Sequence, residues 1–276
     1  MTSVADEETK TGGEGFADAV TVSFGDLERG WFGLARLGRS SEGTSALAVL
    51  FRGQETVGAY AVGRTSDGDS PLTMTVDAPL ERWTVDWDGT DCGFEVVVSA
   101  LAAPVERAGG FEGYEQFVRV EGSVRVGEET GELSAVGQRG HTWGVADWSS
   151  LSLVRSVSAW LGNGGFVLES ERPARADGHD REEVWAALVE NGEPAAVMQP
   201  RLSTTYDGDG HQRRAGLELW MTDEEEGFPV RAAGEVICGS SLDLGALQLD
   251  LAFFHWRSQG VEGVGRYDIL RRSSGK

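Results

Sequence analysis

Short runs in which apolar and polar residues alternate recur along most of the chain. The stretch RWTVDWDG at 82–89 places Trp83, Val85 and Trp87 on one side of an extended backbone and polar residues on the other. Such alternation, together with β-branched residues, predicts half-buried β-strands. Further runs of this kind lie at 18–24, 46–52, 72–78, 94–100, 116–126, 165–170, 184–190, 216–222, 230–239, 247–257 and 263–272.

The residues between these runs are those that favour tight turns. Both asparagines of the chain precede glycine, at Asn163-Gly164 and Asn191-Gly192. This pair is the strongest short signal for a hairpin, because both turn positions prefer positive φ. The segment REEVWAALVENG at 181–192 has some helical character, but its final turn and the neighbouring strands favour a strand.

The number of strands indicates the architecture. Roughly 16–20 strands exceed what one small barrel holds, and their spacing is typical of sandwiches and barrels. We therefore predict an all-β, antiparallel protein with little helix, built from two consecutive domains at 16–152 and 153–276. Residues 1–15 are polar and glycine-rich, which predicts a disordered tail.

Composition restricts the function more than the fold. The formal net charge is −21 in 276 residues, and such a surface repels phosphate backbones, so nucleic acid is not an expected partner. Cys92 and Cys238 are too few for a disulfide framework. No apolar leader follows Met1 and no long apolar run occurs. We therefore expect a soluble, cytoplasmic monomer or homodimer without stable membrane insertion.

One glycine-punctuated stretch, GQRGHTWGVADW at 137–148, gathers chemically active side chains. In an extended backbone, four of them share one face: Arg139, His141, Trp143 and Asp147. A histidine near a carboxylate can exchange protons close to neutral pH, an arginine orients an anion, and an indole stabilises a developing cation. The alternative is a structural plug in which arginine and aspartate pair, and the pattern alone favours that plug.

Other reactive motifs do not occur in the sequence. It contains no GxSxG, no P-loop and no GxGxxG at a strand–helix junction. The four histidines do not pair at metal-binding spacing, so a histidine-rich metal site is not expected. Most of the nine tryptophans lie in predicted strands, where they would build the core or line an apolar pocket.

Four segments resemble one known superfamily, in the same order: PLERWTVDWDG (79–89), YEQFVRVEGSVRV (114–126), GQRGHTWGVADW (137–148) and FFHWRSQGVEGVGRYDILRR (253–272). Together they resemble the lipocalin-like superfamily of hydroxyneurosporene synthase (carotenoid 1,2-hydratase), which includes a bacterial branch of unassigned function. The resemblance implies two consecutive lipocalin-like barrels or sandwiches, a ligand pocket between or within them, and no cofactor. It also implies hydration, cyclisation or isomerisation of hydrophobic polyenes, terpenoids or polyketides, although other members are non-enzymatic.

The match to this superfamily is incomplete at two positions. Gly140 stands where the family usually has Asp, and Ala146 stands where it usually has Arg. Either the loss opened a ligand site or the usual chemistry has been lost. The matching residues are Tyr114, Glu115, Gln116, Arg139, His141, Trp143, Gly144, Asp147, Trp148 and Trp256.

Three functions are compatible with these features, and the first is the one we expect. It is a cofactor-free cyclase, isomerase or hydratase for an isoprenoid, polyene or polyketide-type substrate in a barrel pocket, in secondary metabolism. Asp147 or Glu115 would act as acid or base with His141 as its partner, and Arg139 would orient a polar head group. The alternatives are a lipid or isoprenoid carrier and a structural β-protein that pairs with another subunit. The expected pocket wall is Tyr114, Trp143, Trp148, Phe254 and Trp256.

Overall fold

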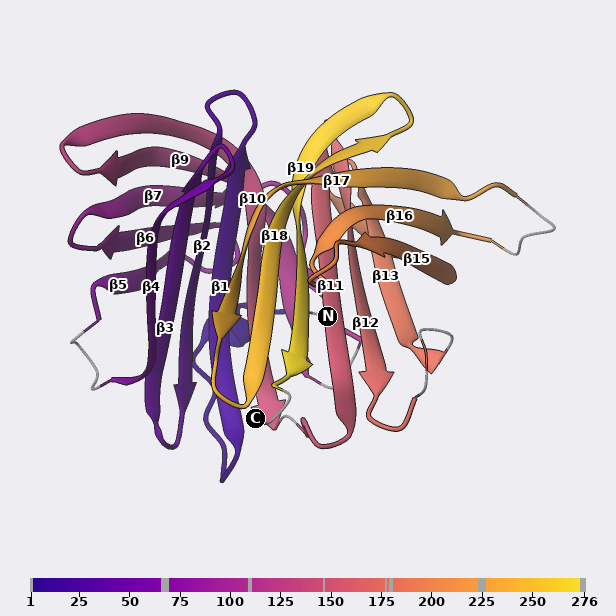
Figure 1. Cartoon of the computed structure of the whole chain (residues 1–276), viewed down its shortest axis with the longest axis horizontal. Helices are drawn as coiled ribbons and strands as arrows, with labels where there is room; N and C mark the ends of the chain where they lie inside the picture. Colours follow the sequence, from indigo (N-terminus) through magenta and orange to yellow (C-terminus); the bar gives the residue numbers. More distant parts are fainter. Residues whose placement is uncertain are drawn as a thin grey trace. The chain divides into compact units, whose positions relative to one another are not determined.

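The computed structural model describes residues 2–65, 70–108, 111–145, 147–176, 178, 181–222 and 227–273. It divides into two compact units, Met1–Ala146 and Asp147–Lys276, each built around one antiparallel sheet (Figure 1). The all-β, lipocalin-like fold predicted from the sequence is confirmed. The expected boundary after residue 152 would cut strand β11 (Leu151–Leu161), which belongs whole to the second unit.

The first unit contains a short 3-10 helix and a ten-stranded sheet. Its elements are η1 (Val4–Glu7), β1 (Phe16–Asp26), β2 (Trp31–Ser40), β3 (Gly43–Arg52), β4 (Glu55–Thr65), β5 (Leu72–Ala78), β6 (Arg82–Asp88), β7 (Cys92–Ala100), β8 (Val105–Glu106), β9 (Glu112–Val126) and β10 (Glu129–Val145). The strand order is β4-β3-β2-β1-β10-β9-β7-β6-β5, and β8 pairs with β9. Strand β5 also packs against β2 and β3, so the sheet curls around an apolar interior.

The second unit contains a nine-stranded sheet. Its elements are β11, β12 (Gly164–Pro173), β13 (Glu183–Glu190), β14 (Glu193–Ala196), β15 (Gln199–Tyr206), β16 (Gln212–Trp220), β17 (Val230–Asp243), β18 (Leu247–Ser258) and β19 (Val261–Arg272). The strand order is β14-β13-β12-β11-β19-β18-β17-β16-β15. No helix in the described ranges has the length and apolarity needed to cross a bilayer.

The two sheets follow the same path. In each unit the first strand, β1 or β11, lies at the centre of the sheet. It pairs with the next strand on one side and with the last strand of the unit, β10 or β19, on the other. Side chains on corresponding strands of the two units can therefore be compared directly.

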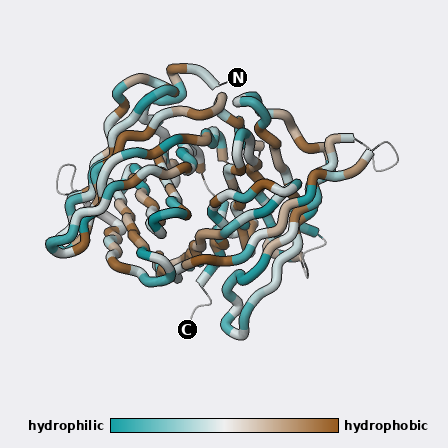
Figure 2. The backbone as a smooth tube through the Cα atoms, turned by 90° about the horizontal axis from the view of Figure 1, so that it is seen from above, coloured by the Kyte–Doolittle hydropathy of each residue, from teal (hydrophilic) through white to brown (hydrophobic). Residues whose placement is uncertain are grey.

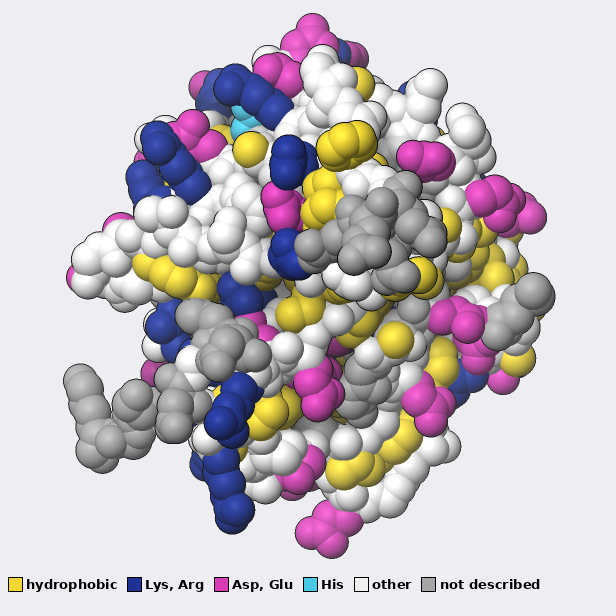
Figure 3. Space-filling view, turned by 90° about the vertical axis from the view of Figure 1, so that its right-hand side faces the viewer, with side chains coloured by type: hydrophobic (Ala, Val, Ile, Leu, Met, Phe, Trp, Pro, Cys, Tyr) yellow, Lys and Arg dark blue, Asp and Glu magenta, His cyan; other side chains and the backbone are white. Residues whose placement is uncertain are grey.

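Alternation along the strands produces the two interiors. In β6, Trp83, Val85 and Trp87 are buried and the residues between them are partly exposed, as the sequence predicts. Figure 2 shows hydrophobic and hydrophilic residues interspersed along the strands. Many charged side chains lie on the surface, and on the face in Figure 3 the basic ones gather mainly on the left while carboxylates are spread more widely. Others are buried, among them Glu7, Asp18 and Arg139 in the first unit and Arg155 in the second.

One of the two predicted Asn-Gly turns is correct. Asn191 and Gly192 connect β13 to β14, and both have positive φ, at 52° and 85°. Between β11 and β12, however, the two turn residues are Gly162 and Asn163, and Gly164 already pairs with Leu161 in the ladder. Gly162 takes the positive φ there, at 59°, so the turn lies one residue earlier than predicted.

The N-terminal segment is not the disordered tail expected from its composition. Val4–Glu7 forms a 3-10 helix, and the backbone N–H and hydroxyl of Ser3 donate to the Asp6 carboxylate at 2.8 and 3.0 Å. Glu7 is buried in the first unit. Composition misleads here because the segment is ordered by polar contacts to the interior of the sheet, which a low hydrophobicity does not reveal.

Candidate functional site

The best candidate site is the interior face of β9 and β10, at the end of these strands where the motif at 137–148 lies. The ladder pairs His141 with Tyr114 and Trp143 with Glu112. Directly paired residues share a face of the sheet, so Tyr114, Arg139 and His141 all point into the first unit. All three are buried, although arginine and histidine are rarely enclosed without partners.

A carboxylate from outside the sheet neutralises the buried arginine. Glu7 Oε2 accepts from Arg139 Nη2 at 2.8 Å and from Trp83 Nε1 at 3.0 Å. The Tyr114 hydroxyl donates to Glu7 Oε1 and accepts from Arg139 Nη1. The guanidinium also lies over the Trp83 ring, 4.4 Å from its centroid. Breaking such a buried pair leaves a charge without compensation, so the four side chains form one unit.

His141 bridges the N-terminal segment and strand β1 through its two ring nitrogens. Its Nδ1 lies 2.7 Å from the backbone oxygen of Asp6 and its Nε2 lies 2.9 Å from Asp18 Oδ2. A carbonyl oxygen can only accept, so Nδ1 carries a hydrogen. Asp18 Oδ2 also accepts the backbone N–H of Lys10 at 2.7 Å. The 2.9 Å contact between Nε2 and Asp18 needs one further hydrogen, on the imidazole or on the carboxyl, so the two groups share a proton.

The phenol of Tyr114 is held in its neutral form. Burial raises its pKa well above the usual range; Arg139 opposes that shift, and the hydrogen bond to Glu7 adds to it. A neutral phenol can donate to an anion, which is what it does toward Glu7. The cluster therefore presents a cation and a neutral donor to a single carboxylate.

Trp143 forms the outer edge of the cluster. Its ring meets the His141 ring edge-on at 5.0 Å, and Lys10 Nζ lies over it at the same distance. Its indole N–H donates to Glu112 at 2.9 Å. The Trp143 ring thus packs against the His141 ring. The Lys10 side chain, which belongs to the N-terminal segment, lies over the Trp143 ring.

Glu115 lies on the opposite face of the sheet from this cluster. It accepts from Arg107 at 2.9 Å and from Gln138 at 2.7 Å. Its ladder partner is Gly140, and a Cβ at Gly140 would come within 2.4 Å of Glu115 Oε2. The absence of a Cβ at Gly140 therefore leaves room for the Glu115 carboxylate on the face opposite His141. The second departure, Ala146, lies outside the described residues.

Asp147 and Trp148 lie beyond the end of β10, in a turn. Alternation predicts that Asp147 shares a face with Arg139, but the strand ends at Val145. Asp147 is exposed, accepts from the Ser149 backbone and hydroxyl, and has a pKa lowered by these bonds. It is an ionised turn residue and not part of the interior cluster.

Phe254 and Trp256 lie in the interior of the second unit. Both are fully buried on β18, their rings stack at 5.7 Å, and Phe166 packs edge-on against Trp256 at 5.1 Å. They belong to the apolar core of that unit. Of the residues expected from the sequence, the structure thus brings together Tyr114, Arg139, His141 and Trp143.

A second buried arginine was not foreseen from the sequence. Arg155 on β11 pairs with Glu182, and Ser170 donates to the same carboxylate. Thr204 lies 3.3 Å from Arg155 Nη1 and hydrogen-bonds the Tyr267 hydroxyl at 2.7 Å. Each unit thus buries an arginine and a tyrosine with one glutamate from outside its sheet. No pattern in the sequence marks Glu7 or Glu182 as buried. Glu7 lies in the polar segment before β1, and Glu182 lies in the polar connection between β12 and β13.

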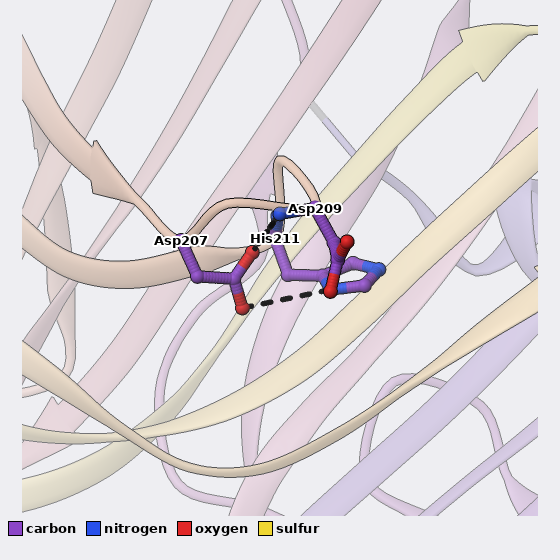
Figure 4. A group of neighbouring side chains, drawn as sticks. All are labelled: Asp207, Asp209 and His211. Atoms are coloured by element: carbon purple, nitrogen blue, oxygen red, sulfur yellow. Dashed lines mark hydrogen bonds and ion pairs between the residues drawn. The ribbon is translucent and has the colours of Figure 1, made fainter.

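One group of side chains among the described residues has the composition of a metal site. Asp207, Asp209 and His211 place one ligand atom each within 4.8 Å of one another in the turn before β16 (Figure 4). The Asp207 carboxylate accepts the backbone N–H groups of Asp209 and His211, both at 3.0 Å, as aspartate does in many turns. His211 Nε2 lies 3.0 Å from the Ser241 hydroxyl. These contacts account for the geometry of the turn.

Comparison with known proteins defines the family. Residues 4–272 match the model described as a domain of unknown function (DUF7064). The chain belongs to this family. No curated protein sequence matches it at a significant level.

Several solved structures share the fold of this chain over both of its units. CghA in complex with Sch210972 superposes with a TM-score of 0.65 at 12% identity, covering 95% of this chain and 89% of that one. An AttH-type protein from Nitrosomonas europaea gives 0.68 at 10% identity, with 94% and 93% covered. Kievitone hydratase from Nectria haematococca gives 0.66 at 12% identity, with 92% and 88% covered. At these identities the likeness shows the fold alone.

Proposed function

We propose that the protein is a cofactor-independent enzyme that cyclises, isomerises or hydrates a hydrophobic isoprenoid, polyene or polyketide-type substrate. The observation that carries the proposal is the 2.9 Å contact between His141 Nε2 and Asp18 Oδ2, which requires a shared proton. It lies beside a buried arginine, a neutral phenol and aromatic rings, in an otherwise apolar interior. The shared fold with a kievitone hydratase and with CghA, which was solved with Sch210972, supports the same class.

The chemistry follows from the position of that proton. Transfer from the His141–Asp18 pair to an alkene or carbonyl of the substrate leaves a cationic or polarised centre. The face of Trp143 can stabilise such a centre once Lys10, which lies over it, moves away, whereas Arg139 already lies over Trp83. The pair then takes a proton back, either from a neighbouring carbon, giving isomerisation or cyclisation, or from an attacking water, giving hydration. In this proposal His141 and Asp18 take the acid–base role that the sequence suggested for Asp147 or Glu115.

A carrier of lipid or isoprenoid molecules is the second candidate. The observation that favours it is the pairing of the Arg139 and Glu7 charges with each other. A polar network that is satisfied internally can stabilise the fold without taking part in a reaction, as a carrier requires.

The test is turnover of a panel of polyenes, terpenoids and polyketides in deuterated water, with product analysis by mass spectrometry. We expect deuterium in the product, and we expect His141→Gln and Asp18→Asn each to lower kcat by about 10²–10⁴-fold. Glu115→Gln, on the opposite face of the sheet, is the control and should retain native kcat. Native turnover by both interior variants would refute the acid–base assignment. Tight binding without any turnover would establish the carrier.

A further inference from the structure

The contacts of Glu7 describe a binding site for a carboxylate. Three donors from three strands converge on it: Trp83 from β6, Tyr114 from β9 and Arg139 from β10. Arginine and neutral hydroxyl or indole donors are the groups that proteins use to bind carboxylates. The donors belong to the rigid sheet, whereas the carboxylate comes from a segment outside it.

The segment that supplies Glu7 has little else to hold it. Of residues 2–15, Glu7 alone is buried, and Val4 is 61% exposed. The segment therefore gains little from the hydrophobic effect. Its other ties to the unit are polar or cation–π contacts. His141 binds the Asp6 carbonyl, Asp18 binds the Lys10 amide, and Arg39 binds the Thr9 hydroxyl at 3.1 Å. Lys10 also lies over the Trp143 ring, and Thr2 donates to Glu106 at 3.5 Å.

The surroundings of the three donors are largely apolar, apart from Gln116, the buried ladder partner of Arg139, whose amide donates to the carbonyls of Leu80 and Ala102. Trp83 belongs to the hydrophobic core of the unit. Farther along the same face of β9 and β10 lie the buried side chains of Val118, Val120 and Ala135. A ligand that places a carboxylate at Arg139 would therefore contact hydrocarbon with the rest of its body.

We propose that Trp83, Tyr114 and Arg139 form the head-group site for a hydrophobic carboxylic acid, and that Glu7 fills this site as a displaceable internal ligand. An incoming carboxylate replaces the Glu7 carboxylate, so the buried arginine keeps its charge partner throughout the exchange. Residues 2–15 then leave the interior face and uncover His141. This inference rests on the proposed function only in naming the substrate class of that site, since the binding step needs no turnover.

The test compares dodecanoate with 1-dodecanol, which share a chain length and differ in the charged head group. Binding is measured by calorimetry for the native protein, for Glu7→Ala and for a variant lacking residues 2–12. We expect both variants to bind dodecanoate about tenfold tighter than the native protein, because the competing internal carboxylate is gone. Dodecanol should bind all three equally. Arg139→Met in the truncated protein should abolish the preference for the acid.

Hydrogen exchange of the native protein gives an independent measurement. Saturating dodecanoate should accelerate exchange at the Lys10 amide, which Asp18 binds in the closed form, and dodecanol should not. Glu182→Ala, the equivalent change in the second unit, is the control and should leave dodecanoate affinity unchanged.

Two outcomes overturn the inference: equal dodecanoate affinity in the native and both altered proteins, or an equal gain for dodecanol. Preferential binding of the acid together with failure of every panel substrate to react would leave the head-group site established and would reject the enzyme. Turnover without any preference for acids would establish the enzyme and would reject the head-group site.

Discussion

The two units bury an arginine in similar chemical surroundings, but they obtain the balancing carboxylate differently. Arg139 pairs with Glu7, which lies on a four-residue helix near the start of the chain. Arg155 pairs with Glu182, which directly precedes strand β13. Glu182 lies between two strands of the same sheet, β12 and β13, whereas Glu7 lies on a short 3-10 helix outside the strands of its sheet. The same charge pair can therefore lock one unit and close the other reversibly.

The largest expected effect is a difference in stability between matched variants. Glu182→Gln should lower the free energy of unfolding of the second unit by about 3 kcal/mol, because Arg155 stays buried without a charge partner. Glu7→Gln should cost about 1 kcal/mol, because the N-terminal segment can detach and admit water to Arg139. Hydrogen exchange of β11 and β10 amides measures each unit separately. Equal losses would contradict the distinction between a fixed and a displaceable carboxylate.

A smaller effect is expected from the outer face of the first unit. Gly140→Asp should lower its free energy of unfolding by about 2 kcal/mol, because the new Cβ would meet Glu115 and bring two carboxylates together. Adding Glu115→Gln should restore part of the loss by removing the repulsion. Chemical denaturation provides the measurement. An unchanged or higher stability of the single variant would show that Glu115 moves aside freely.

The smallest effect appears at alkaline pH and tests how similar the two tyrosines are. Burial raises the pKa of both Tyr114 and Tyr267 above that of an unfolded tyrosine, which is about 10. Above that pH the unfolded chain loses the proton first, so stability is unaffected below pH ~10 and falls above it. The slope is at most about 1.4 kcal/mol per pH unit for each tyrosine.

Denaturation at a series of alkaline pH values should show a shallower slope for Tyr114→Phe and for Tyr267→Phe, each by the share of one tyrosine. A native slope in either variant would show that the corresponding phenol ionises inside the folded unit. Tyr60, a half-buried tyrosine of the first unit, provides a matched Tyr60→Phe control.

Much of the fold could be predicted because alternation is a local property. The buried positions of β6 and the shared face of Arg139, His141 and Trp143 follow from period two alone. The end of β10 at Val145 does not follow from this alternation. Because the strand ends there, Asp147 does not share the face of Arg139 and His141. The turn at Gly162 was misplaced by one residue because two glycines flank Asn163 and the ladder decides between them.

The partners of the site residues could not be predicted. Glu7 and Arg139 are 132 residues apart in the chain, and His141 reaches Asp6 across 135. A polar, glycine-rich segment has the composition of a disordered tail whether or not a buried cation binds it. The pairing of Glu182 with Arg155 was missed for the same reason, although it spans only 27 residues.

These separations set the order in which the two arginines acquire their partners during synthesis. Glu182 leaves the ribosome after Arg155, so the second unit can form its pair as soon as that region emerges. Glu7 precedes Arg139 by 132 residues and must wait, solvated, until β10 has been translated and paired with β1. The Glu7 carboxylate therefore meets its three donors only after the strands that carry them have been made.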